Sequence, residues 1–154
     1  MKSTLWLLIC NGSVAHVYEA AYKETVFTVT RVQELHHDES RLKTHDLVND
    51  RPGHYNKGAQ GRGAYSEKTS PKELELQHFS HELVEFLDQQ WKLKSYHGVV
   101  IATSPHFESL LKEALVPHEK HLGPLIKAML TKDYTRATVK ELEEIFEPVC
   151  QKLM

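Results

Sequence analysis

Apolar residues along the chain recur with two different periods, which predict strands in the first part and alternating helices and strands in the second. Three strand-like segments come first: an apolar run at 6–10, a partly alternating segment at 13–20, and a β-branched and aromatic run at 25–30. Asn11-Gly12 separates the first two, and Lys23-Glu24 precedes the third, so short turns join them. We therefore expect a three-stranded antiparallel meander at the start of the chain.

Helical spacing begins at Ser70-Pro71, where a capping serine and a proline precede apolar residues at helical intervals. The continuous apolar run at 97–103 predicts a strand that is buried on both faces. Ser104-Pro105 opens a second helix, which is expected to end near Leu115. The segment 125–130 fits either a helix or a strand, and we expect a strand because the layout requires one.

A third helix is expected at 138–153, because Thr138 and Glu141 have the spacing of a capping box. Its buried stripe is predicted to consist of Ile145, Val149 and Leu153, which follow one another at intervals of four. The acidic residues of this helix are expected to form a solvated face; they are Glu141, Glu143, Glu144 and Glu147.

This order of elements predicts one α/β domain over residues 1–154. We expect a mixed sheet, made of an antiparallel meander followed by β-α-β-α-β-α crossovers, with helices on both faces, which is the ribonuclease-H-like layout. The apolar stretch 5–10 is shorter than the core of a secretion signal, at about 7–15 residues, and no stretch approaches the ~20 residues of a membrane span. We therefore expect a cytoplasmic protein without a membrane partner. Cys10 and Cys150 are expected to be reduced structural thiols.

The periodic pattern of apolar residues is absent from residues 37–70. This glycine-rich basic segment holds four of the seven glycines. Loops of this length are usually functional or disordered. Within it, residues 51–66 contain three basic residues and no carboxylate, although the whole chain has a net charge of −2. Basic groups with interleaved tyrosines suit phosphates and unpaired bases, and a solvated glycine-rich loop is the alternative. The candidate nucleic-acid-binding residues are Arg51, His54, Tyr55, Lys57, Gly58, Arg62 and Tyr65.

We expect three polar residues near strand ends, where open α/β sheets bind ligands: Asn11, Asp50 and Asp133. They form a possible ligand crevice. The alternative is that Asn11 caps a turn and that Asp50 pairs with Arg51 within the loop.

Metal and cofactor chemistry is not predicted. The strands expected at the centre carry no carboxylates of the kind that hold two metal ions in a nuclease, and the glycine spacing matches no nucleotide-binding fingerprint. His78-x-x-His81 and His118-x-x-His121 have the spacing of metal ligands, but no cysteine lies near them and we expect them on the surface.

Several segments, in their order along the chain, carry a resemblance to a known family. They are Leu42-Lys43, the stretch DLVNDRPG at 46–53, Pro71-Lys72-Glu73 running to Phe79, VVIA at 99–102 with Pro105, and LTKDY at 130–134. Together they resemble the bacterial family named for attachment to host cells, which is similar to the release-factor-like proteins of bacteria and archaea. This resemblance implies the fold of a release-factor central domain.

The release-factor side of the resemblance implies ribosome binding and attack of water on the ester bond of peptidyl-tRNA, driven by a Gly-Gly-Gln tip. Here Gly58-Ala59-Gln60 stands in the basic segment, with the second glycine replaced. Gln60 is therefore the candidate catalytic residue that the resemblance implies.

Two hypotheses of function follow. The first is a translation-linked protein that contacts the ribosome or tRNA through residues 51–66, with or without hydrolysis. The second is a non-catalytic module that binds a protein partner in a surface-attachment or regulatory pathway. The sequence leaves the oligomeric state open.

Overall fold

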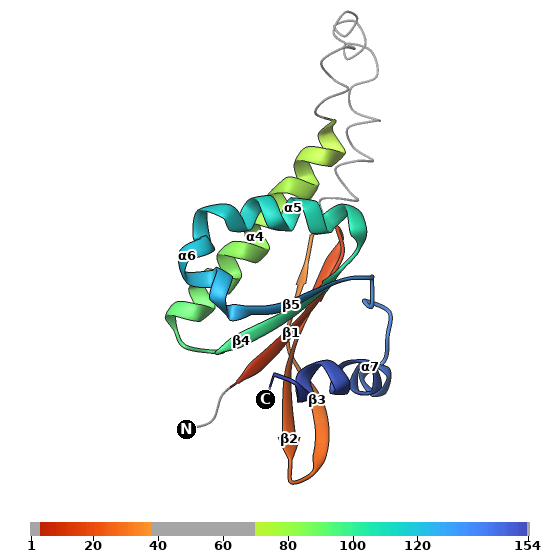
Figure 1. The fold of residues 1–154 in the computed structure, drawn as a ribbon. Helices are drawn as coiled ribbons and strands as arrows, with labels where there is room; N and C mark the ends of the chain where they lie inside the picture. Colours follow the sequence, from red (N-terminus) through yellow and green to blue (C-terminus); the bar gives the residue numbers. More distant parts are fainter. Residues whose placement is uncertain (1–3, 38–69, 154) are drawn as a thin grey trace, which may run out of the picture.

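A mixed sheet with the strand order β3-β2-β1-β4-β5 forms the centre of the molecule (Figure 1). The computed structural model describes residues 4–37 and 70–153. The strands are β1 (Leu5–Cys10), β2 (Val14–Lys23), β3 (Val26–His36), β4 (Gly98–Thr103) and β5 (Ile126–Thr131). The α-helices are α4 (Pro71–Lys92), α5 (Pro105–Leu115), α6 (Glu119–Leu122) and α7 (Val139–Gln151).

The pairing of the strands confirms the predicted meander and the mixed sheet. β1 pairs antiparallel with β2, and β2 pairs antiparallel with β3. On its other side β1 pairs parallel with β4, which pairs parallel with β5. The segment that fitted either helix or strand is therefore the strand β5.

Helices cover both faces of the sheet. On one face α4 and α5 contribute Phe79, Leu83 and Leu111 to a core that includes Leu8 and Ile101 of the central strands. On the other face α7 packs Leu142, Phe146 and Cys150 against Leu7, Ile9 and Val100. Figure 1 shows the same division, with α7 on the side of the sheet away from α4 and α5. Every residue of β1 and β4 is buried, as the continuous apolar runs predict.

The predicted helix starts are found at the expected residues. The Ser70 hydroxyl accepts a hydrogen bond from the Glu73 N–H at 3.0 Å. Thr138 and Glu141 form a complete capping box, with bonds of 3.1 and 2.8 Å. Ser104 occupies the N-cap of α5, but its side chain makes no capping hydrogen bond.

The predicted stripe of α7 is wrong in its rotation. The buried residues are Leu142, Phe146 and Cys150, whereas Ile145 and Val149 are half-buried and Leu153 lies beyond the helix end with 40% of its surface exposed. Both sets recur at intervals of four, so spacing alone does not separate them. The bulky ring of Phe146 decides the rotation, because it packs edge-on against Tyr134 with centroids 5.5 Å apart.

The acidic residues of α7 are also not all solvated. The Glu143 carboxylate accepts a hydrogen bond from the backbone N–H of Val29 in β3 at 3.0 Å. The Glu147 carboxylate accepts one from the Tyr22 hydroxyl at 3.1 Å. Two of the four glutamates therefore tie the helix to the meander.

The connection between α5 and β5 holds structure that the sequence pattern did not reveal. Two short 3₁₀ turns, Val116–His118 and Gly123–Leu125, flank the single-turn helix α6. Buried Leu122 anchors this connection in the same core as α4 and α5. In the part of the chain that the structure describes, no helix combines the length and apolar character needed to cross a bilayer.

Replacing Phe146 with alanine should test the observed rotation of α7. Phe146 is fully buried, so Phe146→Ala is expected to lower the free energy of unfolding by about 3–5 kcal/mol, the usual cost of removing a core phenylalanine. Leu153→Ala is the control, and it should change stability by less than about 0.5 kcal/mol, as surface substitutions do. Urea unfolding followed by circular dichroism measures both, and equal losses would contradict the structure.

Candidate functional site

A crevice lies at the carboxyl ends of β1 and β4. Because these strands are parallel and Cys10 pairs with Thr103, the turns that follow them emerge at the same edge of the sheet. The crevice has a volume of about 220 Å³ and is lined by Gly12, Ser13, Lys72, Leu76, Ser104, His106 and Phe107. This edge is where open α/β sheets bind their ligands.

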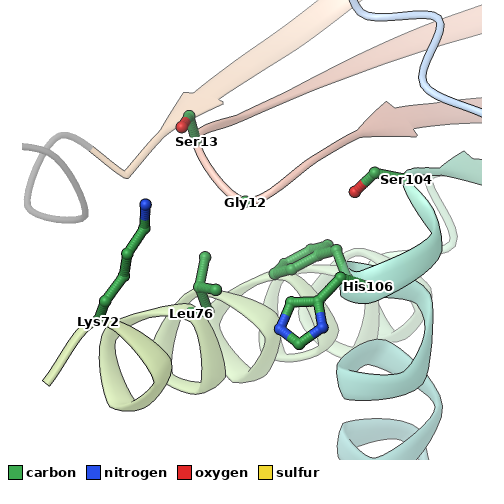
Figure 2. Close-up of a pocket in the computed structure, with 7 residues that line it drawn as sticks. Gly12, Ser13, Lys72, Leu76, Ser104 and His106 are labelled. Atoms are coloured by element: carbon green, nitrogen blue, oxygen red, sulfur yellow. The ribbon is translucent and has the colours of Figure 1, made fainter. Parts of the chain in front are cut away.

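Side chains from α4 form one wall of the crevice. Figure 2 shows Lys72 and Leu76 rising from α4 toward the Gly12–Ser13 turn. Leu76 approaches Gly12 so closely that a β-carbon at that position would overlap the leucine side chain. With glycine at position 12, the turn and the Leu76 side chain are in close contact, and a larger residue there would require Leu76 to shift.

The crevice combines positive and hydrogen-bonding groups with one carboxylate at its rim. Lys72 supplies an ammonium, and Ser13 and Ser104 supply hydroxyls. Because the Ser104 hydroxyl caps no helix N–H, it keeps its hydrogen-bonding capacity at the start of α5, where helix N–H groups lack partners within the helix. The His106 ring nitrogen Nε2 lies 3.1 Å from Oε1 of Glu73, so this carboxylate has a partner.

Asn11 and Asp133 come together beside the crevice, as their places at strand ends predict. The Asn11 side chain donates to Oδ2 of Asp133 at 2.9 Å and to the Thr135 hydroxyl at 3.2 Å. Its carbonyl oxygen accepts from the N–H groups of Ser13 and Val14 at 2.8 and 3.1 Å. These four bonds use both amide hydrogens and both lone pairs of Asn11, so it positions the β1–β2 turn rather than binding a ligand.

Asp133 is held in its ionised form by this arrangement. Burial raises the pKa of its carboxyl, but hydrogen bonds from Thr135 and Asn11 outweigh burial, and the pKa lies below its usual value. The turn after β1 and the loop after β5 are thus joined by a charge-assisted hydrogen bond.

The remaining predicted site residues lie outside the described residues. These are Asp50 of the crevice prediction, the candidate catalytic residue Gln60, and the nucleic-acid-binding set Arg51, His54, Tyr55, Lys57, Gly58, Arg62 and Tyr65. The two flanks of that segment are described. His37 donates its backbone N–H to the Ser13 carbonyl at 2.9 Å, and its ring stacks on Phe79 of α4. Ser70 begins α4, two residues before Lys72. The chain therefore leaves and re-enters the described fold beside the crevice.

The two histidine pairs differ in their surroundings. His78 and His81 are exposed on α4, as expected. His118 and His121 are only partly exposed, because the connection that carries them packs against Asp88 near the end of α4. The simple surface expectation is wrong for this pair, and the sequence gives no signal for it because Asp88 is distant along the chain.

A family model described as "protein required for attachment to host cells" matches residues 6–146. The chain belongs to this family. The match to the host-attachment family runs from β1 into α7, so it includes the crevice and the segment between His37 and Ser70. It names no release factor, so that part of the resemblance stays a prediction. Among curated proteins, none matches the chain.

The Asn11–Asp133 bond should make stability depend on pH in the acid range. The pKa of Asp133 is lower in the folded protein than in the unfolded chain, so its contribution is present above the unfolded value of about 3.9 and is lost as pH falls through the folded pKa. Asp133→Asn should therefore be less stable than the wild type at pH 7, and the difference should shrink toward pH 3. Thermal unfolding at the two pH values measures it, and a difference that grows in acid would refute the assignment.

Proposed function

We propose that this host-attachment family protein binds RNA of the translation machinery, ribosomal RNA or tRNA, with a backbone phosphate in the crevice. One observation carries the proposal: the basic segment joins the described fold on both sides of the crevice. The Ser13–His37 hydrogen bond fixes one end of the segment, and the Ser70 cap of α4 fixes the other. The described residues on both sides of this segment therefore lie at the edge that offers Lys72 and two hydroxyls.

The crevice has the chemistry that a phosphate group requires. The ammonium of Lys72 supplies charge, and the hydroxyls of Ser13 and Ser104 supply donors. The start of α5 adds the positive end of the helix dipole. Glu73 opposes an anion, but its Oε1 is engaged by Nε2 of His106 at 3.1 Å.

The basic segment supplies what the crevice lacks. Arg51, Lys57 and Arg62 carry positive charge in a stretch without carboxylates. Tyr55 and Tyr65 offer rings for stacking on unpaired bases. The proposal therefore combines a phosphate in the crevice with further contacts from residues 51–66.

The ribonuclease-H-like and release-factor-like assignment of the fold belongs to the same proposal. It is supported by the strand order β3-β2-β1-β4-β5, in which β2 alone runs opposite to the others. Hydrolysis would be a further step that depends on Gln60. Water would add to the ester carbonyl carbon of peptidyl-tRNA, and the bond from this carbon to the ribose oxygen of the tRNA would break. The ribose oxygen would leave with a proton from the water as a hydroxyl, and the peptide would be released as a carboxylic acid.

Sedimentation with ribosomes, and binding to isolated tRNA, tests the proposal. The wild type should bind in a salt-dependent manner. Arg51→Ala/Lys57→Ala/Arg62→Ala should bind more weakly, and its log–log slope of affinity against salt should be smaller by about 2, if each residue contacts one phosphate of a single strand. Lys72→Ala should weaken binding in the same direction.

A matched control removes three positive charges elsewhere. Lys23, Lys140 and Lys152 are exposed, and Lys23 lies at the β2–β3 turn, at the opposite end of the sheet from the crevice. Their triple alanine variant should bind as the wild type does. If this variant also lost binding, the interaction would depend on the net charge of the protein and not on the crevice edge. Absence of binding by the wild type at low salt would exclude the proposal.

A groove beside α4 favours the second hypothesis, a protein-interaction module. It has a volume of about 620 Å³, and half-buried Leu35 of β3 and Phe86 of α4 lie in it among polar residues. Recovery of one protein partner from nuclease-treated extract, lost on Phe86→Asp and kept on Lys72→Ala, would favour this function over RNA binding.

A further inference from the structure

We propose that Asp88, His118 and His121 form a binding site for a divalent transition metal, with zinc as the best match. Asp88 lies near the end of α4, His118 in the 3₁₀ turn after α5, and His121 in α6. One ligand atom from each lies within 4.8 Å of the other two. Among the described residues, this is the one group of three or more histidine, cysteine or acidic side chains that meets this spacing.

The two oxygens of Asp88 have different partners. Oδ1 lies 2.5 Å from Nε2 of His121 and 3.8 Å from Nδ1 of His118. Oδ2 lies 3.4 Å from the Lys92 ammonium. A metal ion would bind Oδ1 together with the two imidazoles, and Lys92 would hold the second oxygen from outside, as outer partners of metal ligands do.

The site is already organised by its surroundings. Asp88 is 7% exposed, so its carboxylate has little freedom. The Trp91 ring packs against His121, with centroids 4.6 Å apart, and buried Leu122 anchors the helix that carries His121. A ligand set fixed in this way loses little conformational freedom when a metal binds.

Two of the three side chains already face one another. Oδ1 of Asp88 and Nε2 of His121 are hydrogen-bond partners, although Asp88 and His121 come from different helices.

The separations of the two histidines from Oδ1 of Asp88 are close to those of a tetrahedral zinc site. Zinc bonds of about 2.0–2.1 Å place neighbouring ligand atoms about 3.3 Å apart. His121 must therefore move from Asp88 by under about 1 Å, and His118 must approach by about half an ångström, both from the separations above. The metal would replace the proton on Nε2 of His121. In a neutral ring this proton would move to Nδ1, and in a charged ring it would be released to water. Three protein ligands leave one position for water, as in sites that bind or activate a small molecule.

His78 and His81 provide a matched comparison. They have the same three-residue spacing and are exposed on a regular helix. Among the described residues, however, no carboxylate lies close enough to both histidines to form a group with ligand atoms within 4.8 Å of one another. Sequence spacing treats the two pairs alike, and only the docking of residues 116–122 against the end of α4 separates them.

The test uses the full chain without an affinity tag, stripped with a chelator. Calorimetry with Zn²⁺ should give one site per chain, and Co²⁺ should give the visible absorption of a tetrahedral ion. His118→Gln and His121→Gln should each weaken Zn²⁺ binding by at least about tenfold. His78→Gln/His81→Gln should leave it unchanged.

Two results would overturn the proposal: no Zn²⁺ binding by the wild type up to about 0.1 mM, or equal affinity in the wild type and in both single variants at 118 and 121. Asp88→Asn should weaken binding as the histidine variants do. If circular dichroism shows that Asp88→Asn does not fold, the variants at the partly exposed histidines 118 and 121 still test the proposal.

Discussion

The parallel pairing of β1 with β4 is the constraint on which the other elements depend. All six pairs, from Leu5 with Gly98 to Cys10 with Thr103, join residues that are buried, so neither face of this pair can be left to water. Two separate layers of helix are therefore required, α4 and α5 on one side and α7 on the other. The meander and β5 extend the sheet on either side of this centre.

The same pairing explains where the polar groups gather. Parallel strands end at one edge, so the turn after β1 and the start of α5 lie together there. Asn11 then fixes the β1–β2 turn to the loop after β5 through Asp133. His37 and Ser70, which flank the basic segment in the sequence, lie at this edge too.

Local patterns predicted the elements well, because strand burial and helix capping depend on residues that are close together in the sequence. The apolar runs gave β1 and β4, and Thr138 with Glu141 gave the start of α7. Asn11 caps the turn after β1, as the alternative for this residue predicts, and it also contacts Asp133 beyond the end of β5. Family membership was anticipated from ordered short segments and is shown by the match over residues 6–146.

Features that depend on docking between distant segments were not predictable. Two stripes of equal spacing compete on α7, and only the fit of Phe146 beside Tyr134 selects one. Asp88 meets His118 and His121 because the connection after α5 packs against the end of α4, and no local pattern encodes that contact. The segment 51–66 was singled out by composition alone, and its predicted contacts await the binding experiments.

The hydrogen bond from Val29 to Glu143 has a consequence for how copies of this protein behave in solution. Among the described strands β3 lies at one end of the sheet, with Val26 and Val32 exposed along it. Strands in such a position can offer backbone N–H groups with which a second chain can pair. Glu143 occupies one of these donors and sets a negative charge where an incoming strand would have to pair. A charged group at an exposed strand edge is one of the features that oppose pairing with a second chain, and this effect of Glu143 would be felt at high concentration rather than in the folding stability of a single copy.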